Sequence, residues 1–400
     1  MVLTLTSNPF LYMKSLKRFG LLLFIILAII LGVVLGGVMP IWGLRIFATF
    51  ASLFGNFLKF IIPLIIVGLI VPAIGHIGRT AGRLLLLTIL LAYLDGAFAG
   101  FFAYLGSVNV FPGLIPAKNA VGEAGNIVPL EPFFTVEMPP VFDVVSALLL
   151  AFTLGLGIAY FQGKYMKGFF EEFRQIVEWV ISKAIIPLLP LYIFSIFLSM
   201  SHTGEAMHVL RVFMGVIGVI FAMHLFWLIL EYSIAGLVVK RNPLRMLLTM
   251  LPAYFTALGT ASSAATIPVT LQRTQKLGVN DSVASFVVPL CATIHMPGSI
   301  LKITSCAVAV MLMQNQAFDA GMFAAFILSL GIMAIAAPGV PGGTIMTALA
   351  LLQSVLGFAD TDQALMIALY IAMDSFGTAG NVTGDGAIAV IVDRFRQKAP

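Results

Sequence analysis

The sequence predicts an all-α polytopic membrane protein with about eight transmembrane helices and two re-entrant helical hairpins. Three observations support this fold class. Of the 400 residues, 60% are hydrophobic and only 10% are charged, whereas a soluble domain has roughly 25% charged residues. Uncharged runs recur along the chain, each long enough for a helix that spans a bilayer. Two of these runs are interrupted in their middle by helix-breaking or small residues.

The uncharged runs can each cross about 30 Å of hydrocarbon, which takes about 20 helical residues. They are Phe19–Leu44, Phe60–Ile77, Val144–Gly163, Val212–Leu230, Met246–Gln272 and Gly321–Ala359. The first follows Lys14, Lys17 and Arg18 and contains no small-residue cleavage site. We therefore expect a retained span there rather than a signal peptide.

The basic residues indicate the orientation of the spans, because short loops rich in Lys and Arg stay in the cytoplasm. If the chain crosses as predicted, the following clusters lie on one side: 14–18, 79–83, 164–167, 240–245, 273–276 and 394–398. The net charge of +5 then reflects topology, so we expect lipid and no nucleic acid as partner. We expect a cell-membrane protein of the inner membrane of a prokaryote. Cys291 and Cys306 lie in apolar sequence and predict core residues without a disulfide.

Two of the runs do not fit single spans. Gly321–Ala359 has 39 uncharged residues, and "APGVPGG" at 337–343 would end a helix in its middle. Met246–Gln272 contains "GTASSAAT" at 259–266 and is flanked by basic residues at both ends. Each predicts a re-entrant hairpin, at about 243–275 and about 320–357; a kinked helix is the alternative for either run alone. Paired interruptions of this kind point to a transporter binding site.

The last apolar segment, Ala364–Val392, is expected to form a helix with one polar face. Asp374, Thr378, Asn381 and Asp385 are spaced i, i+4, i+7 and i+11, which places them on one side of a helix. A charge at the bilayer centre costs about 3 kcal/mol or more, so this face should line a site rather than meet lipid. Carboxylates, amides and hydroxyls suit hard cations and ammonium groups.

The order of four motifs resembles the glutamate transporter superfamily, the dicarboxylate/amino acid:cation symporters. A serine-containing hairpin, "ATIHMPGS" (292–299), a "GVPGG" hairpin and a "DxxxTxxNVTGD" helix follow one another, and the resemblance is strongest over 240–390. It implies an elevator-type transporter that forms homotrimers. Residues 20–75 and 140–200 would form the trimerisation scaffold, and residues 80–110 and 205–394 the moving transport domain.

The resemblance also implies which residues bind solute and sodium. The solute positions are Ser262, Ser263, Val340, Gly342, Asp374, Gly377, Thr378 and Asn381. Among them, Asp374 resembles the carboxylate that holds a substrate amino group, and Asn381 resembles a pocket amide on the substrate carboxylate. The sodium positions, by side chain or backbone carbonyl, are Asp385, Asn381, Cys291, Thr293, Ala334 and Ala337.

One departure from the family pattern bears on the substrate. Members that carry acidic amino acids have an arginine at the position of Gly377, so a planar bidentate partner for a side-chain carboxylate is missing there. We therefore favour a neutral amino acid as substrate. The alternative is an acidic amino acid or dicarboxylate held by Lys302, which is predicted on the same helix face as His295. Lys302 could instead neutralise Asp95 or Asp374.

A second departure bears on cation coupling. The family motif "NMDGT" reads "HMPGS" here, so Pro297 replaces a sodium-binding Asp and one sodium site should be lost. Asp95 is expected near the same place, and Asp95 and His295 are candidates to carry a cation or a proton. The ordinary pKa of histidine, about 6.5, suits a proton carrier. In the alternatives, His295 only locks the helices together and Asp95 faces a water-filled crevice.

These features favour a secondary active symporter over two other classes. A passive channel needs a continuous pore, whereas broken hairpins around one polar cluster indicate an occluded site. A membrane-embedded enzyme is the third class, but the sequence contains no HExxH or GxSxG motif. We expect no organic cofactor, with Na⁺ as coupling ion and H⁺ as the alternative.

Overall fold

The structure is a computed structural model, which describes residues 9–77, 83–115, 130–142, 144–161, 163–204, 206–335, 337 and 342–397. Val340, the predicted tip residue of the second hairpin, lies outside these ranges. The regular structure within them is helical. Five helical segments are long and apolar enough to cross a membrane, and a bent helix pair adds a sixth. The prediction of an all-α polytopic membrane protein is confirmed.

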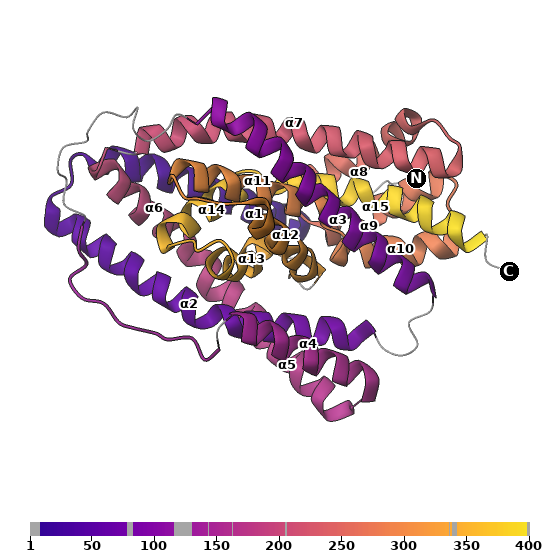
Figure 1. The fold of residues 1–400 in the computed structure, drawn as a ribbon, viewed down its shortest axis with the longest axis horizontal. Helices are drawn as coiled ribbons and strands as arrows, with labels where there is room; N and C mark the ends of the chain where they lie inside the picture. Colours follow the sequence, from indigo (N-terminus) through magenta and orange to yellow (C-terminus); the bar gives the residue numbers. More distant parts are fainter. Residues whose placement is uncertain are drawn as a thin grey trace, which may run out of the picture.

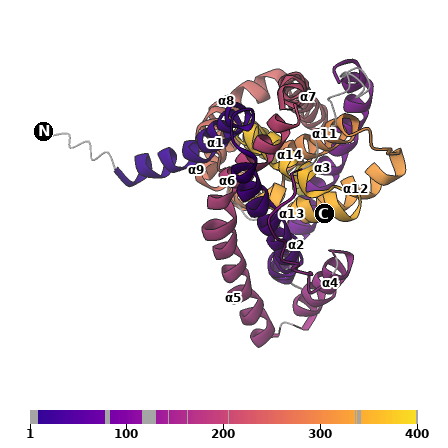
Figure 2. The ribbon, with the colours of Figure 1, turned by 90° about the vertical axis from the view of Figure 1, so that its left-hand side faces the viewer.

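The first half of the chain forms mostly long helices. They are α1 (Pro9–Gly36), α2 (Ile41–Ile77), α3 (Arg83–Val110), the 3₁₀ turn η1 (Phe111–Gly113), α4 (Val144–Phe161), α5 (Lys164–Val180), the π-helical turn η3 (Ile181–Ile185), α6 (Ile186–His202) and α7 (Ala206–Val239). α1 packs against α6, and α2 packs against α4, α5 and α6. Figures 1 and 2 show α4 and α5 beside α2, away from α7.

The second half forms shorter helices around a central one. They are α8 (Pro243–Thr260), α9 (Ser263–Lys276), α10 (Asp281–Ile294), α11 (Pro297–Met313), α12 (Ala320–Ile335), α13 (Gly343–Ser354), α14 (Asp360–Ala372) and α15 (Asp374–Gln397). α15 contacts α7, α8, α9, α10 and α11, and α3 packs against α11. α15 therefore runs through the middle of this group (Figure 1).

The two interrupted runs each form a pair of packed helices. α8 ends where Ala261 takes the left-handed conformation (φ 47°), and Ser262 then caps α9 by accepting a hydrogen bond from Ala265 N at 3.3 Å. α13 begins after Gly342, whose φ of 74° suits glycine. The packing of α8 on α9 and of α12 on α13 matches the helix–break–helix pattern of the sequence.

The structure contradicts two predictions of a continuous helix. The segment Ala364–Val392 is bent by 61° between α14 and α15, because Met373 leaves the helical conformation. The segment around "HMPGS" breaks at His295 and Met296, directly before Pro297. Proline disfavours helical backbone at the residue before it and lacks an N–H. His295 and Lys302 therefore do not share one helix.

The connection after α3 has little regular structure where it is described, and it is held against α2. Arg45 Nε donates to the Glu131 carbonyl at 3.0 Å, and Asn56 Nδ2 donates to the Val136 carbonyl at 2.8 Å. The Arg45 guanidinium also lies 4.4 Å from the centre of the Phe133 ring. These contacts fix residues 130–142 along the helix.

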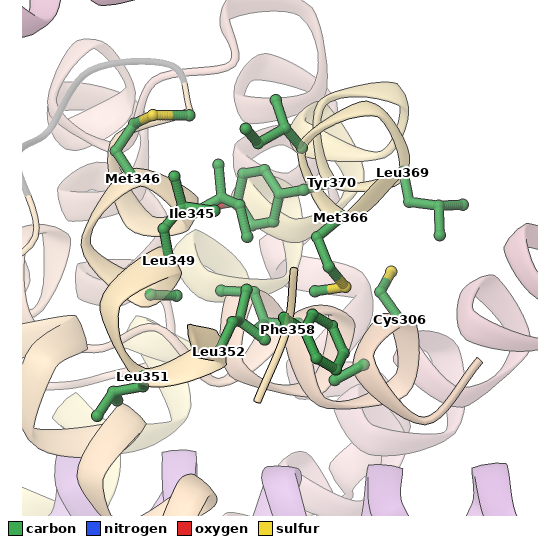
Figure 3. Close-up of a cluster of buried hydrophobic side chains, with 14 of the residues drawn as sticks. Cys306, Ile345, Met346, Leu349, Leu351, Leu352, Phe358, Met366, Leu369 and Tyr370 are labelled. Atoms are coloured by element: carbon green, nitrogen blue, oxygen red, sulfur yellow. The ribbon is translucent and has the colours of Figure 1, made fainter. Parts of the chain in front are cut away.

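An apolar cluster joins α11, α13 and α14 (Figure 3). Leu349 and Leu352 of α13 and Met366 of α14 are fully buried, and Phe358, between these two helices, is 2% exposed. Cys306 of α11 lies at the edge of this cluster. Both cysteines are buried and free, as predicted, and the cluster fixes α14 relative to the second helix pair.

Close approach of α1 and α6 depends on glycine, and this gives a test of the packing. A Cβ added at Gly36 would lie 2.5 Å from the Leu198 carbonyl oxygen, whereas a Cβ at Gly37 would meet no atom within 4 Å. We expect Gly36→Ala to destabilise the protein by about 1–3 kcal/mol, the usual cost of overpacking. Gly37→Ala should unfold at the wild-type temperature in detergent. Equal unfolding temperatures for the two variants would contradict this packing.

Candidate functional site

The first polar cluster lies where the second helix pair meets α11 and the start of α15. Asp374 opens α15 directly after the bend at Met373. Its Oδ2 accepts a hydrogen bond from Gly342 N at 3.1 Å, and its Oδ1 lies 3.4 Å from Lys302 Nζ. Three separate elements are thus joined through one carboxylate whose side chain is 13% exposed.

Lys302 lies in the notch left by Gly377. Its side chain is fully buried, and Nζ lies 3.4 Å from the centre of the Tyr370 ring, a cation–π contact. A Cβ added at Gly377 would be 2.9 Å from Nζ. Residue 377 has no side chain, and the space it leaves holds the ammonium group of Lys302 from α11. Of the two partners predicted for Lys302, Asp95 and Asp374, the lysine contacts Asp374.

Asn381 holds the first turn of α11. Its Oδ1 accepts hydrogen bonds from Gly298 N at 2.8 Å and Ser299 N at 3.3 Å, and its Nδ2 donates to Ser299 Oγ at 3.1 Å. The first N–H groups of a helix have no partner within the helix, and Met296 at the N-cap makes no side-chain cap hydrogen bond. One turn earlier on α15, Thr378 donates to the Asp374 carbonyl at 3.0 Å.

A second polar cluster lies further along α15. His295, at the break between α10 and α11, has Nε2 2.9 Å from Asp95 Oδ2 of α3 and Nδ1 2.9 Å from Asp385 Oδ1 of α15. His295 and Asp385 are each 1% exposed. The structure thus brings Asp95 and His295 together, and it adds Asp385 to the pair. One imidazole ring joins three segments of the chain.

Sequence reasoning missed Glu231 of α7. It is 5% exposed, and its carboxylate groups with Asp95 and His295, the ligand atoms of all three lying within 4.8 Å of one another. The signal was present, because Glu231 is a single carboxylate inside "LILEYSIAGL" and ionisable residues within spans mark functional sites. The uncharged run Val212–Leu230 ends one residue before Glu231, so the run itself does not include it.

His224 of α7 supports the first turn of α11 from the other side. Its Nε2 lies 2.8 Å from the Gly298 carbonyl and its Nδ1 2.9 Å from the Ile220 carbonyl. A Cβ on Gly298 would meet the Gly377 carbonyl at 2.7 Å. α7, α11 and α15 therefore meet closely at Gly298, midway between the two polar clusters on α15.

The remaining predicted positions are more scattered. Ser262 is buried and caps α9, and Ser263 is half-buried beside it. Thr293 is exposed and donates to the Leu290 carbonyl at 2.7 Å. The Cys291 carbonyl accepts from His295 N at 2.9 Å.

At the end of α12, the two buried alanines predicted as sodium positions lie close together. The Ala334 carbonyl accepts from Ala337 N at 3.2 Å. The assignment of these carbonyls and of the other positions to sodium remains a prediction.

Helix breaks at membrane depth that surround buried charges are the arrangement of secondary transporters. The chain belongs to the sodium:dicarboxylate symporter family, whose model matches residues 21–395. This family is one of transporters and not of enzymes.

Named relatives share part of this sequence. The chain is 32% identical over 163 residues to "Excitatory amino acid transporter 4" of Mus musculus, covering 40% of this chain and 29% of that protein. It is 34% identical over 156 residues to "Excitatory amino acid transporter 2" of Homo sapiens, covering 39% and 27%. It is 30% identical over 161 residues to "Neutral amino acid transporter A" of Homo sapiens, covering 40% and 30%. The matches thus span less than a third of each relative.

The capping role of Asn381 can be tested by stability. Asn381→Leu leaves two buried N–H groups of α11 without an acceptor, and each such group costs about 1–3 kcal/mol. We expect a clearly lower unfolding temperature in buffer without solute or sodium. Asn109→Leu is the control, because Asn109 is exposed and its side chain donates to the Leu105 carbonyl of its own helix at 2.7 Å. An unchanged unfolding temperature in Asn381→Leu would show that the cap is dispensable.

Proposed function

We propose that this protein is a secondary active symporter that carries a carboxylate-bearing organic solute across a membrane together with sodium. The strongest support is the contact of Gly342, Asp374 and Lys302. At this contact the break of the second helix pair, α11 and the start of α15 meet around two charged side chains. Such a junction of broken helices suits a binding site that opens alternately to either side. Membership of the sodium:dicarboxylate symporter family supports the same class and the sodium coupling.

For the solute, the placement of Lys302 favours an acidic amino acid or a dicarboxylate. An ammonium group has three donors, and Lys302 Nζ faces the Asp374 carboxylate and the Met373 carbonyl at the long distances of 3.4 and 3.5 Å. It therefore retains donor capacity for a solute carboxylate at the junction of α11 and α15. In this proposal the lysine takes the role of the arginine that position 377 lacks.

A neutral amino acid is the second candidate. Asp374 is present to hold an amino group, and one relative is named a neutral amino acid transporter. An amine-bearing solute would compete with Lys302 for Asp374, whereas a dicarboxylate would leave that pair in place. The other proposed solute contacts are Ser262, Ser263, Val340, Gly342, Thr378 and Asn381.

For assembly, we propose the homotrimer and the elevator motion that the family resemblance implies. Residues 20–75 and 140–200 would form the scaffold, and residues 80–110 and 205–394 would move with the solute. The packing of α2 with α4, α5 and α6, which is more extensive than the packing of these helices on the second half of the chain, supports this division. The proposed location is the cytoplasmic membrane of a prokaryote.

Uptake into liposomes tests the proposed function. Purified protein in liposomes with an inward Na⁺ gradient should take up labelled succinate or aspartate, and uptake should saturate with solute concentration. Collapse of the Na⁺ gradient should abolish accumulation above equilibrium. Flux that does not saturate and follows the solute gradient alone would show a channel and contradict the proposal.

Lys302→Met tests the solute class, because it keeps an unbranched side chain and removes the charge. A solute at about a hundredfold its Kd stabilises a protein by about 2.7 kcal/mol. In Na⁺ buffer we expect aspartate or succinate to raise the unfolding temperature of the wild type and not of Lys302→Met. Stabilisation of the wild type by serine, with none by aspartate or succinate, would establish the neutral amino acid instead.

Two further variants refine this measurement. Gly377→Ala places a methyl group 2.9 Å from Lys302 Nζ, so it should weaken binding while costing little stability, since the lysine tip can move. Asp374→Asn should abolish binding of amine-bearing solutes. If aspartate binds Asp374→Asn as it binds the wild type, the amino-group assignment is wrong.

A further inference from the structure

The second group of buried charges is not used by the proposed solute site. It consists of Glu231, Asp95, His295 and Asp385, here called the Glu231 cluster. The four residues come from α7, α3, the α10–α11 break and α15, so the cluster joins four segments. Any function of the Glu231 cluster therefore depends on the charges of these four side chains.

Glu231 is the member of the cluster whose carboxylate oxygens receive no hydrogen bond from the others. It is 5% exposed, and neither carboxylate oxygen has a hydrogen-bond partner in the described part of the chain. Its oxygen lies within 4.8 Å of ligand atoms of Asp95 and His295. A buried carboxylate without a donor or a counter-ion is strongly unfavourable.

The charges of the Glu231 cluster do not balance. It holds three carboxyl groups and one imidazole ring, and both ring nitrogens already face carboxylates at 2.9 Å. Even a doubly protonated His295 would compensate one of three negative charges. At least one more positive charge is therefore required among these groups. The place for it is between Glu231 and Asp95, because the carboxylate of Glu231 has no hydrogen-bond donor in the described part of the chain.

The small number of ligand atoms favours a proton over a metal ion as that charge, because Asp95, Glu231 and His295 each offer one. A Cβ on Gly384 would lie 2.8 Å from Glu231 Oε2 and 2.9 Å from His295 Cε1, so the carboxyl group and the ring fill the notch of this glycine. A bound metal ion needs several oxygen ligands arranged around it. A proton needs only two carboxyl groups that approach closely enough to share it.

We propose that Glu231 and Asp95 form a proton-binding site. The carboxyl group of Glu231 carries the proton and donates a hydrogen bond to the carboxylate of Asp95. His295 connects this pair to Asp385 and so to α15, the helix that also carries Asp374. The role of this site in coupling rests on the proposed symport. Proton binding by Glu231 does not depend on that proposal. The titratable groups around Glu231 are Asp95 on α3, His295 at the break, Asp385 on α15 and its own neighbour Tyr232.

Infrared spectroscopy of the purified protein tests proton binding directly. The wild type should show the carbonyl band of a protonated carboxylic acid, shifted in D₂O and lost as the pH is raised, and Glu231→Gln should lack it. Asp362→Asn is the matched control. Asp362 is a buried carboxylate that accepts from Ala359 N at 3.0 Å and Gln316 Nε2 at 3.2 Å, so the band should remain. A wild type without the band, or an unchanged band in Glu231→Gln, overturns the proposal.

Liposome uptake tests the coupling role. With no Na⁺ gradient, an inward proton gradient should drive solute uptake by the wild type, and Glu231→Gln should lose this component. An equal proton-driven component in both proteins overturns the role of Glu231. If only the Na⁺ gradient drives uptake, coupling to protons is refuted while the symport proposal stands. If neither gradient drives uptake, the symport proposal fails, and the infrared band alone decides the proton site.

Discussion

A charge inside a bilayer must find its partner within the protein, and this constraint organises the structure around α15. That helix carries Asp374 and Asp385 in the apolar interior, where an uncompensated charge costs about 3 kcal/mol or more. It is accordingly enclosed by α7, α8, α9, α10 and α11 rather than exposed to lipid. Lys302 and His295 reach the two carboxylates from neighbouring segments. The charges thereby determine which segments must surround this helix.

The helix breaks follow from the same constraint, applied to backbone groups. A break at membrane depth leaves N–H and carbonyl groups that lipid cannot satisfy. Ser262 caps α9 locally, Asn381 caps α11 from another helix, and Asp374 accepts the N–H of Gly342. The side chains of the polar face on α15 therefore serve two purposes, since they hold broken helices in place and present polar groups where those helices meet.

The two polar clusters are connected by one rigid element. Asp374 and Asp385 are eleven residues apart on α15, and a rise of 1.5 Å per residue separates them by about 16 Å. Between them, Gly298 of α11 lies against Gly377 and Asn381 without room for a side chain. A change at one cluster that moves α11 relative to α15 would also move the other. This is a physical route by which the proposed solute site and the proposed proton site would be coupled.

The sequence by itself determined the membrane class, the paired interruptions and the polar face of α15, because each depends on local composition or on helical periodicity. It also identified Asp95 and His295 as a candidate pair and offered Asp95 or Asp374 as the partner of Lys302. The tertiary structure alone decided which charges meet: Lys302 with Asp374 in the notch of Gly377, and His295 between Asp95 and Asp385. It also revealed Glu231, which no spacing connects to Asp95. Such pairings depend on how helices cross and where Met373 and Pro297 interrupt them, and residue spacing along one helix holds no information about the helix that packs against it.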